Sequence, residues 1–226
     1  MTETPIEKLQ RILREKAPDP SAPIQIAERR ELMEKTSFKV KQDIDVETVQ
    51  VAGLQAEWLR APAAQTDRAI LYLHGGGLVV ATLVAARDQG LSMPRAAVCI
   101  SPWGDMTCSN ESFRTRDHAD PMVKHASITQ MADLYLNGAD PKEPLASPNF
   151  ADLTGLPPML IHVGSDETLV DDAIALDRKA KADGVQSTLE VWDKMVHVWH
   201  AFHPMLPEGQ DGIERVGEFL CQQWAA

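Results

Sequence analysis

The chain has 226 residues, of which 44% are hydrophobic and 24% charged, and its formal net charge is -11. This composition can build a sizeable core, so we expect one compact domain over residues 1–226 and not a disordered chain. The acidic balance argues against nucleic acid and anionic membranes as partners, because both require clustered Lys and Arg.

Targeting and cofactor signals are scarce. No stretch has the length and composition of a membrane span or a signal peptide, so the cytoplasm is the expected location. The cysteines, Cys99, Cys108 and Cys221, lack a CxxC pair and are expected to be free thiols without zinc. We expect no metal and no other cofactor, and a homodimer remains open.

The first third of the chain predicts a helical cap and then a sheet. Residues 5–16 and 26–35 have helical patterns, and together they form an expected cap segment over residues 1–40. Two strands hinged near Gly53 follow, and they open a sheet core expected over residues 45–226. The continuous apolar run AILYL, residues 69–73, predicts a strand buried on both faces.

Strands and helices alternate after this point. An apolar helix follows residues 74–77 and is closed by Gly90. The later elements are predicted strands at 96–101, 158–164 and 187–192, and predicted helices at 128–136, 169–183 and 212–224. This order predicts an α/β fold with a mostly parallel sheet flanked by helices, whose ligands lie beyond the carboxyl ends of the strands. Residues 102–127 are expected to be an irregular surface segment.

The tetrapeptide HGGG, His74 to Gly77, follows the apolar run at 69–73 directly. Glycines allow backbone N–H groups to approach a developing oxyanion without obstruction by side chains. The alternative is a glycine-rich turn that only requires positive φ angles.

A second polar cluster, VGSDETLVDD, stands at the end of the strand at 158–164. Asp166 and Glu167 lie where the parallel-sheet rule places functional side chains. The alternative is that these carboxylates cap the helix that follows, since a helix N-terminus favours negative charge.

Three histidines in MVHVWHAFH follow the last predicted strand. His197, His200 and His203 are three residues apart, which raises a metal site as one interpretation, although no HExxH spacing accompanies them. In the other interpretation His197 meets an acid of the preceding cluster and acts as a general base.

The segments HGGG, RAAVCISPWGDMT, PNFADLTGLPPMLIHVGSDETLVDD and LEVWDKMVHVWHAF together resemble the hormone-sensitive-lipase-like branch of the bacterial α/β-hydrolase esterases. This resemblance implies an α/β-hydrolase-like fold and a small-molecule ester substrate. It makes Glu167 the catalytic acid, with neighbouring Asp166 as a rival, and His197 the base. It also places the oxyanion donors at Gly75 and Gly76, with Gly77 completing a loop that begins at His74.

The chain departs from the family at the nucleophile, because none of its serines lies in a GxSxG elbow. HGGG passes directly into a helix that resembles the one after the elbow. Two missing βα units of ~30 residues each correspond to a loss of roughly 60–80 residues. In elbow register Leu73 takes the place of the serine, and residues 69–73 are expected to pair with the strand at 96–101.

Three hypotheses follow. The chain descends from a carboxylesterase and is impaired, with Ser101 and Ser165 as the nearest substitute nucleophiles. Alternatively, it is a catalytically silent remnant that binds a small apolar ligand or partner between the N-terminal helix and the HGGG loop. The third hypothesis is that the gap is an artefact of cloning or gene annotation.

Overall fold

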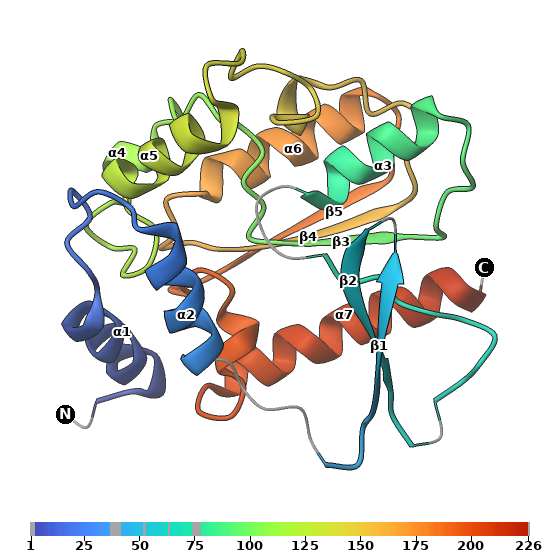
Figure 1. Ribbon diagram of the computed structural model, residues 1–226, viewed down its shortest axis with the longest axis horizontal. Helices are drawn as coiled ribbons and strands as arrows, with labels where there is room; N and C mark the ends of the chain where they lie inside the picture. The colour runs from blue at the N-terminus through green and yellow to red at the C-terminus, as the bar shows by residue number, and fades with distance from the viewer. Residues whose placement is uncertain (1–2, 37–41, 52, 63, 74–77, 226) are drawn as a thin grey trace. The chain divides into compact units, whose positions relative to one another are not determined.

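The computed structural model describes residues 3–36, 42–51, 53–62, 64–73 and 78–225 (Figure 1). The chain divides into two compact units, residues 25–72 and residues 1–24 with 73–226. None of the helices within the described ranges is long and apolar enough to cross a bilayer.

The smaller unit contains helix α2 (Ile26–Thr36) and the strands β1 (Asp45–Val51) and β2 (Leu54–Arg60). The two strands pair in antiparallel register around Gly53, whose φ of +81° suits the tight turn. The predicted hairpin is confirmed. Its strands form a sheet of their own, however, and do not begin the parallel sheet.

The predicted strand at residues 69–73 is wrong. These residues adopt no strand, and Ile70, Leu71 and Tyr72 are exposed to 66%, 77% and 84%. An apolar run becomes a buried strand only where neighbouring strands accept its backbone hydrogen bonds. Among the described residues, the sheet that this segment was expected to join consists of β3, β4 and β5, with β3 at its edge.

The larger unit carries the predicted alternation of strands and helices. Its strands are β3 (Ala97–Ile100), β4 (Met159–Gly164) and β5 (Ser187–Trp192), and both pairings, β3 with β4 and β4 with β5, are parallel. Its helices are α1 (Pro5–Lys16), α3 (Leu78–Asp88), α4 (Ser112–Thr115), α5 (His125–Leu136), α6 (Val170–Ala182) and α7 (Pro207–Ala225), with 3₁₀ turns η1 (Pro148–Phe150) and η2 (Trp199–Phe202).

Helices cover both faces of this parallel sheet. In Figure 1, α3 and α6 lie above the strands and α7 lies below them. Apolar side chains of α3 and α6 pack with alternate residues of β3 and β4 in the main core, among them Leu83, Leu176, Cys99 and Ile161. Parallel strands need this cover because both of their faces are apolar.

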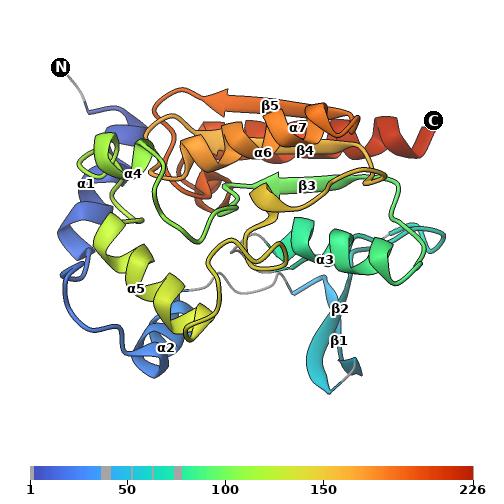
Figure 2. The ribbon, with the colours of Figure 1, turned by 90° about the horizontal axis from the view of Figure 1, so that it is seen from above.

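The carboxyl ends of the strands lie near α1 and α4, toward which the arrows of β3 and β5 point in Figure 2. The segment at 102–127, expected on the surface, contributes to a second core cluster. This cluster buries Trp103, Met106, Cys108 and Phe113 against Ile128 of α5. The segment is buried because its few apolar residues face α5 while its backbone is held by polar partners such as Asp172.

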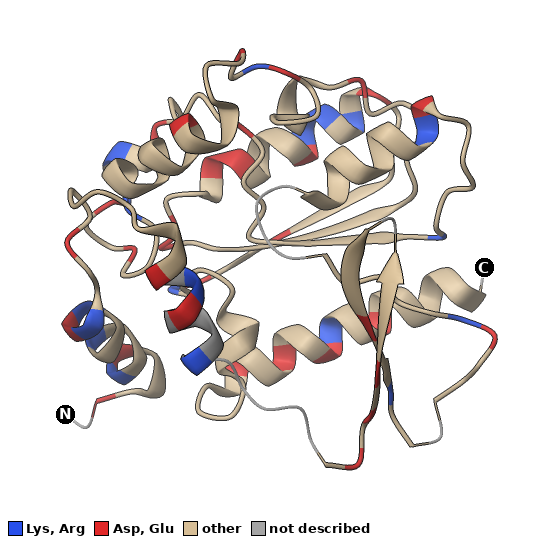
Figure 3. Ribbon diagram, viewed as in Figure 1, with Lys and Arg blue, Asp and Glu red and all other residues tan. Residues whose placement is uncertain are grey.

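Helix α1 lies at the same end of the sheet. Thr4 and Glu7 form a capping box at its start, which satisfies otherwise unpaired N–H groups. Charged residues of both signs alternate along its outer surface (Figure 3). Its apolar side is anchored by Leu9, which packs in a third cluster with Val196 and Trp199.

Candidate active site

Glu167 lies in the turn that follows the carboxyl end of β4. The Glu167 N–H donates to the carbonyl of Gly164 at 3.2 Å, and the Gly164 N–H donates to Glu167 Oε1 at 2.6 Å. Glu167 is completely buried. Gly164 is required here because a Cβ at this position would collide with the carbonyl of Met195. The loops after β4 and β5 therefore approach each other closely.

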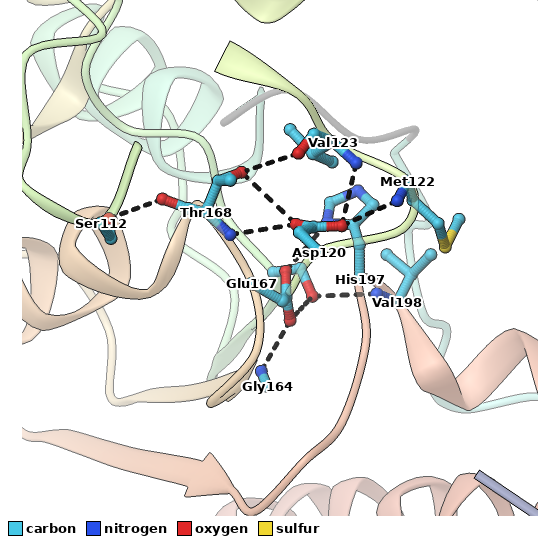
Figure 4. A network of polar contacts seen from close by, with 10 residues as sticks. Ser112, Asp120, Met122, Val123, Gly164, Glu167, Thr168, His197 and Val198 are labelled. Carbon is cyan, nitrogen blue, oxygen red and sulfur yellow. Dashed lines mark hydrogen bonds and ion pairs between the residues drawn. The ribbon is translucent and has the colours of Figure 1, made fainter. Parts of the chain in front are cut away.

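His197, in the loop after β5, meets this acid. Its Nδ1 lies 2.9 Å from Glu167 Oε2, and its side chain is 24% exposed (Figure 4). A carboxylate can only accept hydrogen bonds, so Nδ1 is the protonated nitrogen and Nε2 carries the lone pair. This geometry would allow the imidazole to accept a proton at Nε2 while the carboxylate holds its orientation.

Asp166, the rival acid, faces a different partner. Its Oδ2 accepts a hydrogen bond of 3.0 Å from Gln10 Nε2 of α1, and the same amide donates to the Lys194 carbonyl at 3.3 Å. The structure thus brings His197 to Glu167, whereas Asp166 connects the loop to α1.

The pKa of His197 lies above its ordinary value. Burial lowers it, but the hydrogen bond to Glu167, the charge of Glu167 and the charge of Asp120 together outweigh burial. The surroundings therefore stabilise the imidazolium that forms when Nε2 accepts a proton.

Asp120 is a buried carboxylate that the sequence analysis missed. Its Oδ1 accepts the N–H groups of Met122 and Val123 at 2.8 and 2.9 Å, and its Oδ2 accepts the Thr168 N–H at 3.0 Å (Figure 4). It thereby connects the 120–123 turn to the loop after β4 that carries Glu167. Its only sequence signal is the Asp-Pro pair with Pro121, which favours a turn.

The other two histidines of the C-terminal cluster do not join His197. The Nε2 of His200 lies 3.0 Å from Nδ1 of His162 on β4, and burial lowers the pKa of His200 to about 3. His203 is exposed. The described residues contain no group of three or more potential metal ligands, so this geometry does not favour the metal interpretation.

The substitute nucleophiles considered from sequence are both occupied elsewhere. Ser101 Oγ lies 2.8 Å from Glu167 Oε1, and Ser165 Oγ accepts the Lys194 N–H at 2.8 Å. Each hydroxyl therefore has a structural partner. The oxyanion residues proposed from sequence, Gly75, Gly76 and Gly77, and the motif residue His74 lie outside the described residues.

A surface hollow of ≈ 350 Å³ lies apart from Glu167 and His197. Its lining residues are Pro20, Phe113, Arg114, Asp117, Lys124, His125 and Ala126. Most of these side chains are polar or charged, so the hollow does not favour an apolar ligand.

Comparisons with known proteins agree with this fold. Residues 70–201 match the family described as the α/β hydrolase fold. An acetyl-hydrolase of Streptomyces hygroscopicus is 53% identical over 146 residues, which cover 65% of this chain and 49% of that protein. An esterase of Acinetobacter venetianus is 30% identical over 146 residues, covering 64% of this chain and 48% of its own length. The chain thus spans about half the length of these relatives.

Solved structures are similar over nearly the whole chain. An esterase/lipase from an uncultured bacterium has a TM-score of 0.95 at 48% identity, with 100% of both chains covered. An esterase from the bacterial hormone-sensitive lipase family has a TM-score of 0.90 at 36% identity, with 99% of both chains covered.

Proposed function

Because the chain belongs to the α/β-hydrolase family, in its hormone-sensitive-lipase-like branch, we propose that it descends from a carboxylesterase acting on short acyl esters. The observation that carries this proposal is the Glu167–His197 contact of 2.9 Å at the carboxyl ends of parallel strands. Parallel α/β sheets bind their ligands at this edge.

In this proposal each residue has one role. Glu167 holds the imidazole in the Nδ1–H tautomer and stabilises the imidazolium. His197 uses Nε2 to accept the proton of a serine hydroxyl as the oxygen attacks the acyl carbon, and then returns it to the leaving alcohol. The backbone N–H groups of Gly75 and Gly76 would stabilise the oxyanion, and Gly77 would complete the loop.

The chain itself lacks the serine that this cycle needs, since no GxSxG occurs in it. Removing the nucleophile of a triad lowers kcat by about a millionfold. We therefore propose that this chain turns over esters very slowly or not at all. It would retain the acid and the base of the ancestral site.

An internal deletion between the HGGG loop and α3 would explain the missing nucleophile. The solved esterase/lipase structure matches this chain over its full length, so the segments on both sides of the proposed gap have counterparts in that structure. This match supports a deletion inside the chain. In the Streptomyces relative, 146 residues make up only 49% of the protein, so that relative is longer than this chain. The lost part would be the βα unit that carries the elbow and the unit before it.

An ester assay tests the impairment. We expect p-nitrophenyl acetate and p-nitrophenyl butyrate to be hydrolysed at the same low rate by the purified chain and by His197→Ala. Turnover at ordinary enzyme rates that the substitution abolishes would reveal a nucleophile in the present chain and contradict the proposal.

Restoring the missing segment tests the descent. The corresponding segment of the Streptomyces acetyl-hydrolase would be inserted between Leu73 and Leu78, in place of residues 74–77. We expect the folded product to hydrolyse p-nitrophenyl butyrate, and His197→Ala in the same background to be inactive. A folded product without turnover would argue against an ancestral esterase site and favour a silent binding protein, which butyrate esters would stabilise thermally without being cleaved.

A further inference from the structure

Ser101 occupies the first position after β3 and is held there by its backbone. Its N–H donates to the carbonyl of His162 at 2.7 Å, and its side chain is buried, with 3% of the residue exposed. Its φ of 48° lies in the left-handed region, which costs a residue with a Cβ about 1 kcal/mol or more and persists only where the surroundings enforce it.

The hydroxyl of Ser101 joins two loops that come from different strands. It donates to Glu167 Oε1 at 2.8 Å, in the loop after β4. It also accepts the N–H of Val198 at 3.1 Å, in the loop after β5. Val198 follows His197 directly and has a left-handed φ of 47° itself. One oxygen atom thus contacts the acid and the residue next to the base.

We propose that Ser101 is a positioning residue for the Glu167–His197 pair, and not a substitute nucleophile. Glu167 Oε1 receives two donors, the Ser101 hydroxyl and the Gly164 N–H, so Oε2 is left for the imidazole. The hydroxyl proton is committed to the carboxylate, which leaves His197 no proton to remove from this serine. The catalytic meaning of this role rests on the proposed function, but the geometry does not.

Removal of the hydroxyl has two effects of opposite sign on the imidazole. Oε1 loses a donor, which makes the carboxylate a stronger partner for His197. At the same time the carboxylate and the Val198 N–H lose their common anchor, and the Nδ1–Oε2 contact can lengthen. We expect the second effect to be the larger one, because the hydroxyl contacts both Glu167 and the Val198 N–H and its loss frees the acid and the residue beside His197 at once.

An NMR titration of the chain as it exists tests the proposal. The His197 signals are assigned by their absence in His197→Ala. We expect Ser101→Ala to lower the pKa of His197 by about one unit. Ser101→Gly accepts the left-handed φ without strain and also lacks the hydroxyl, so we expect the same change and a folded protein even if the alanine variant unfolds.

Ser165→Ala is the matched control. Its hydroxyl also contacts the loop after β5, through the Lys194 N–H, but it lies beside Asp166 and not beside Glu167. We expect it to leave the pKa of His197 unchanged. An unchanged pKa in both Ser101 variants, or an equal fall in Ser165→Ala, would overturn the positioning role. Because no ester is involved, failure of the esterase proposal would not produce either result.

Discussion

Glu167 is held through both of its carboxylate oxygens, one by two donors and the other by an imidazole. Its neighbour Asp166 has a similar carboxylate but faces α1. The difference arises from the turn after β4. In this turn the Glu167 N–H donates to the Gly164 carbonyl, and the side chains of the two neighbouring residues therefore face different partners. Both residues carry a carboxylate, so their positions in this turn decide which of them contacts His197.

This contrast predicts different effects of two isosteric substitutions. Glu167→Gln should lower the free energy of unfolding by about 1–3 kcal/mol, because a buried hydrogen bond between charged groups is lost. The pKa of His197 is raised in the folded protein, so this stabilisation is complete below the pKa of an unfolded histidine and is lost as the pH rises through the folded value. The cost should therefore be larger at about pH 5.5 than at about pH 8.5.

Urea unfolding at both pH values checks this expectation, with Asp166→Asn as the control that shows a small cost without that pH trend. The comparison between variants is necessary because burial depresses the pKa values of His162 and His200. Protonation of these two histidines lowers the stability of the fold as the pH falls, which is the opposite trend. An equal cost of Glu167→Gln at both pH values would show that the ion pair is absent in solution.

At the scale of elements, α7 shows how a helix is adapted to its neighbours. The periodicity predicts a helix over 212–224, and the helix begins earlier, at Pro207, a residue favoured in the first turn. Gly212 is buried against the His200 ring, where a Cβ would lie 2.9 Å from two ring atoms. Gly217, on the same helix, has open space around it.

Alanine at these two glycines should have opposite effects. Gly212→Ala should destabilise the protein by about 1–3 kcal/mol, because the added methyl group overpacks the contact with His200. Gly217→Ala should stabilise it by up to about 1 kcal/mol through helix propensity. Midpoints of urea unfolding give both values. A similar gain from both substitutions would show that α7 does not pack on the 3₁₀ turn η2 as described.

The helices and strands also show which parts of the structure the sequence could predict and which it could not. Hydrophobic periodicity and glycines at the ends of elements predict much of the fold. The elements predicted in this way are α1, α3 and α6, the hairpin, and the strands β3, β4 and β5. Residues 69–73 have an equally clear strand pattern, yet they form no strand. Periodicity shows that a segment could form a strand, but not whether it pairs with an edge strand such as β3. The His197–acid contact was predictable from strand ends, whereas Asp120 and the role of Ser101 depend on loop geometry that no period encodes.

For the whole molecule, the central question is whether a chain without its elbow still closes a core. The reactivity of the three cysteines reports on whether this core is closed. Cys99 on β3 and Cys108 in the second cluster are buried, whereas Cys221 on α7 is exposed. Burial raises the pKa of the Cys99 thiol to about 12, and burial with the charge of Asp172 raises that of Cys108 to about 12.

A thiol count under native conditions follows from these positions. With Ellman's reagent at about pH 8, we expect Cys221 to react rapidly and the other two thiols only after denaturant is added, because the thiolate is the reactive form. Cys221→Ser should remove the rapid phase. Rapid reaction of all three thiols would mean that the parallel sheet is open in solution.

Helix α1 has a wider role than its place at the start of the chain suggests. Through Gln10 it contacts Asp166 in the loop after β4 and Lys194 in the loop after β5, and through Arg14 it reaches the carbonyl of Ala119, beside Asp120. The two loops follow different strands, and this amphipathic helix is one of the supports that they share, together with the Ser101 hydroxyl. Local melting of α1 would therefore remove one common support of these loops while the strands beneath them stayed intact.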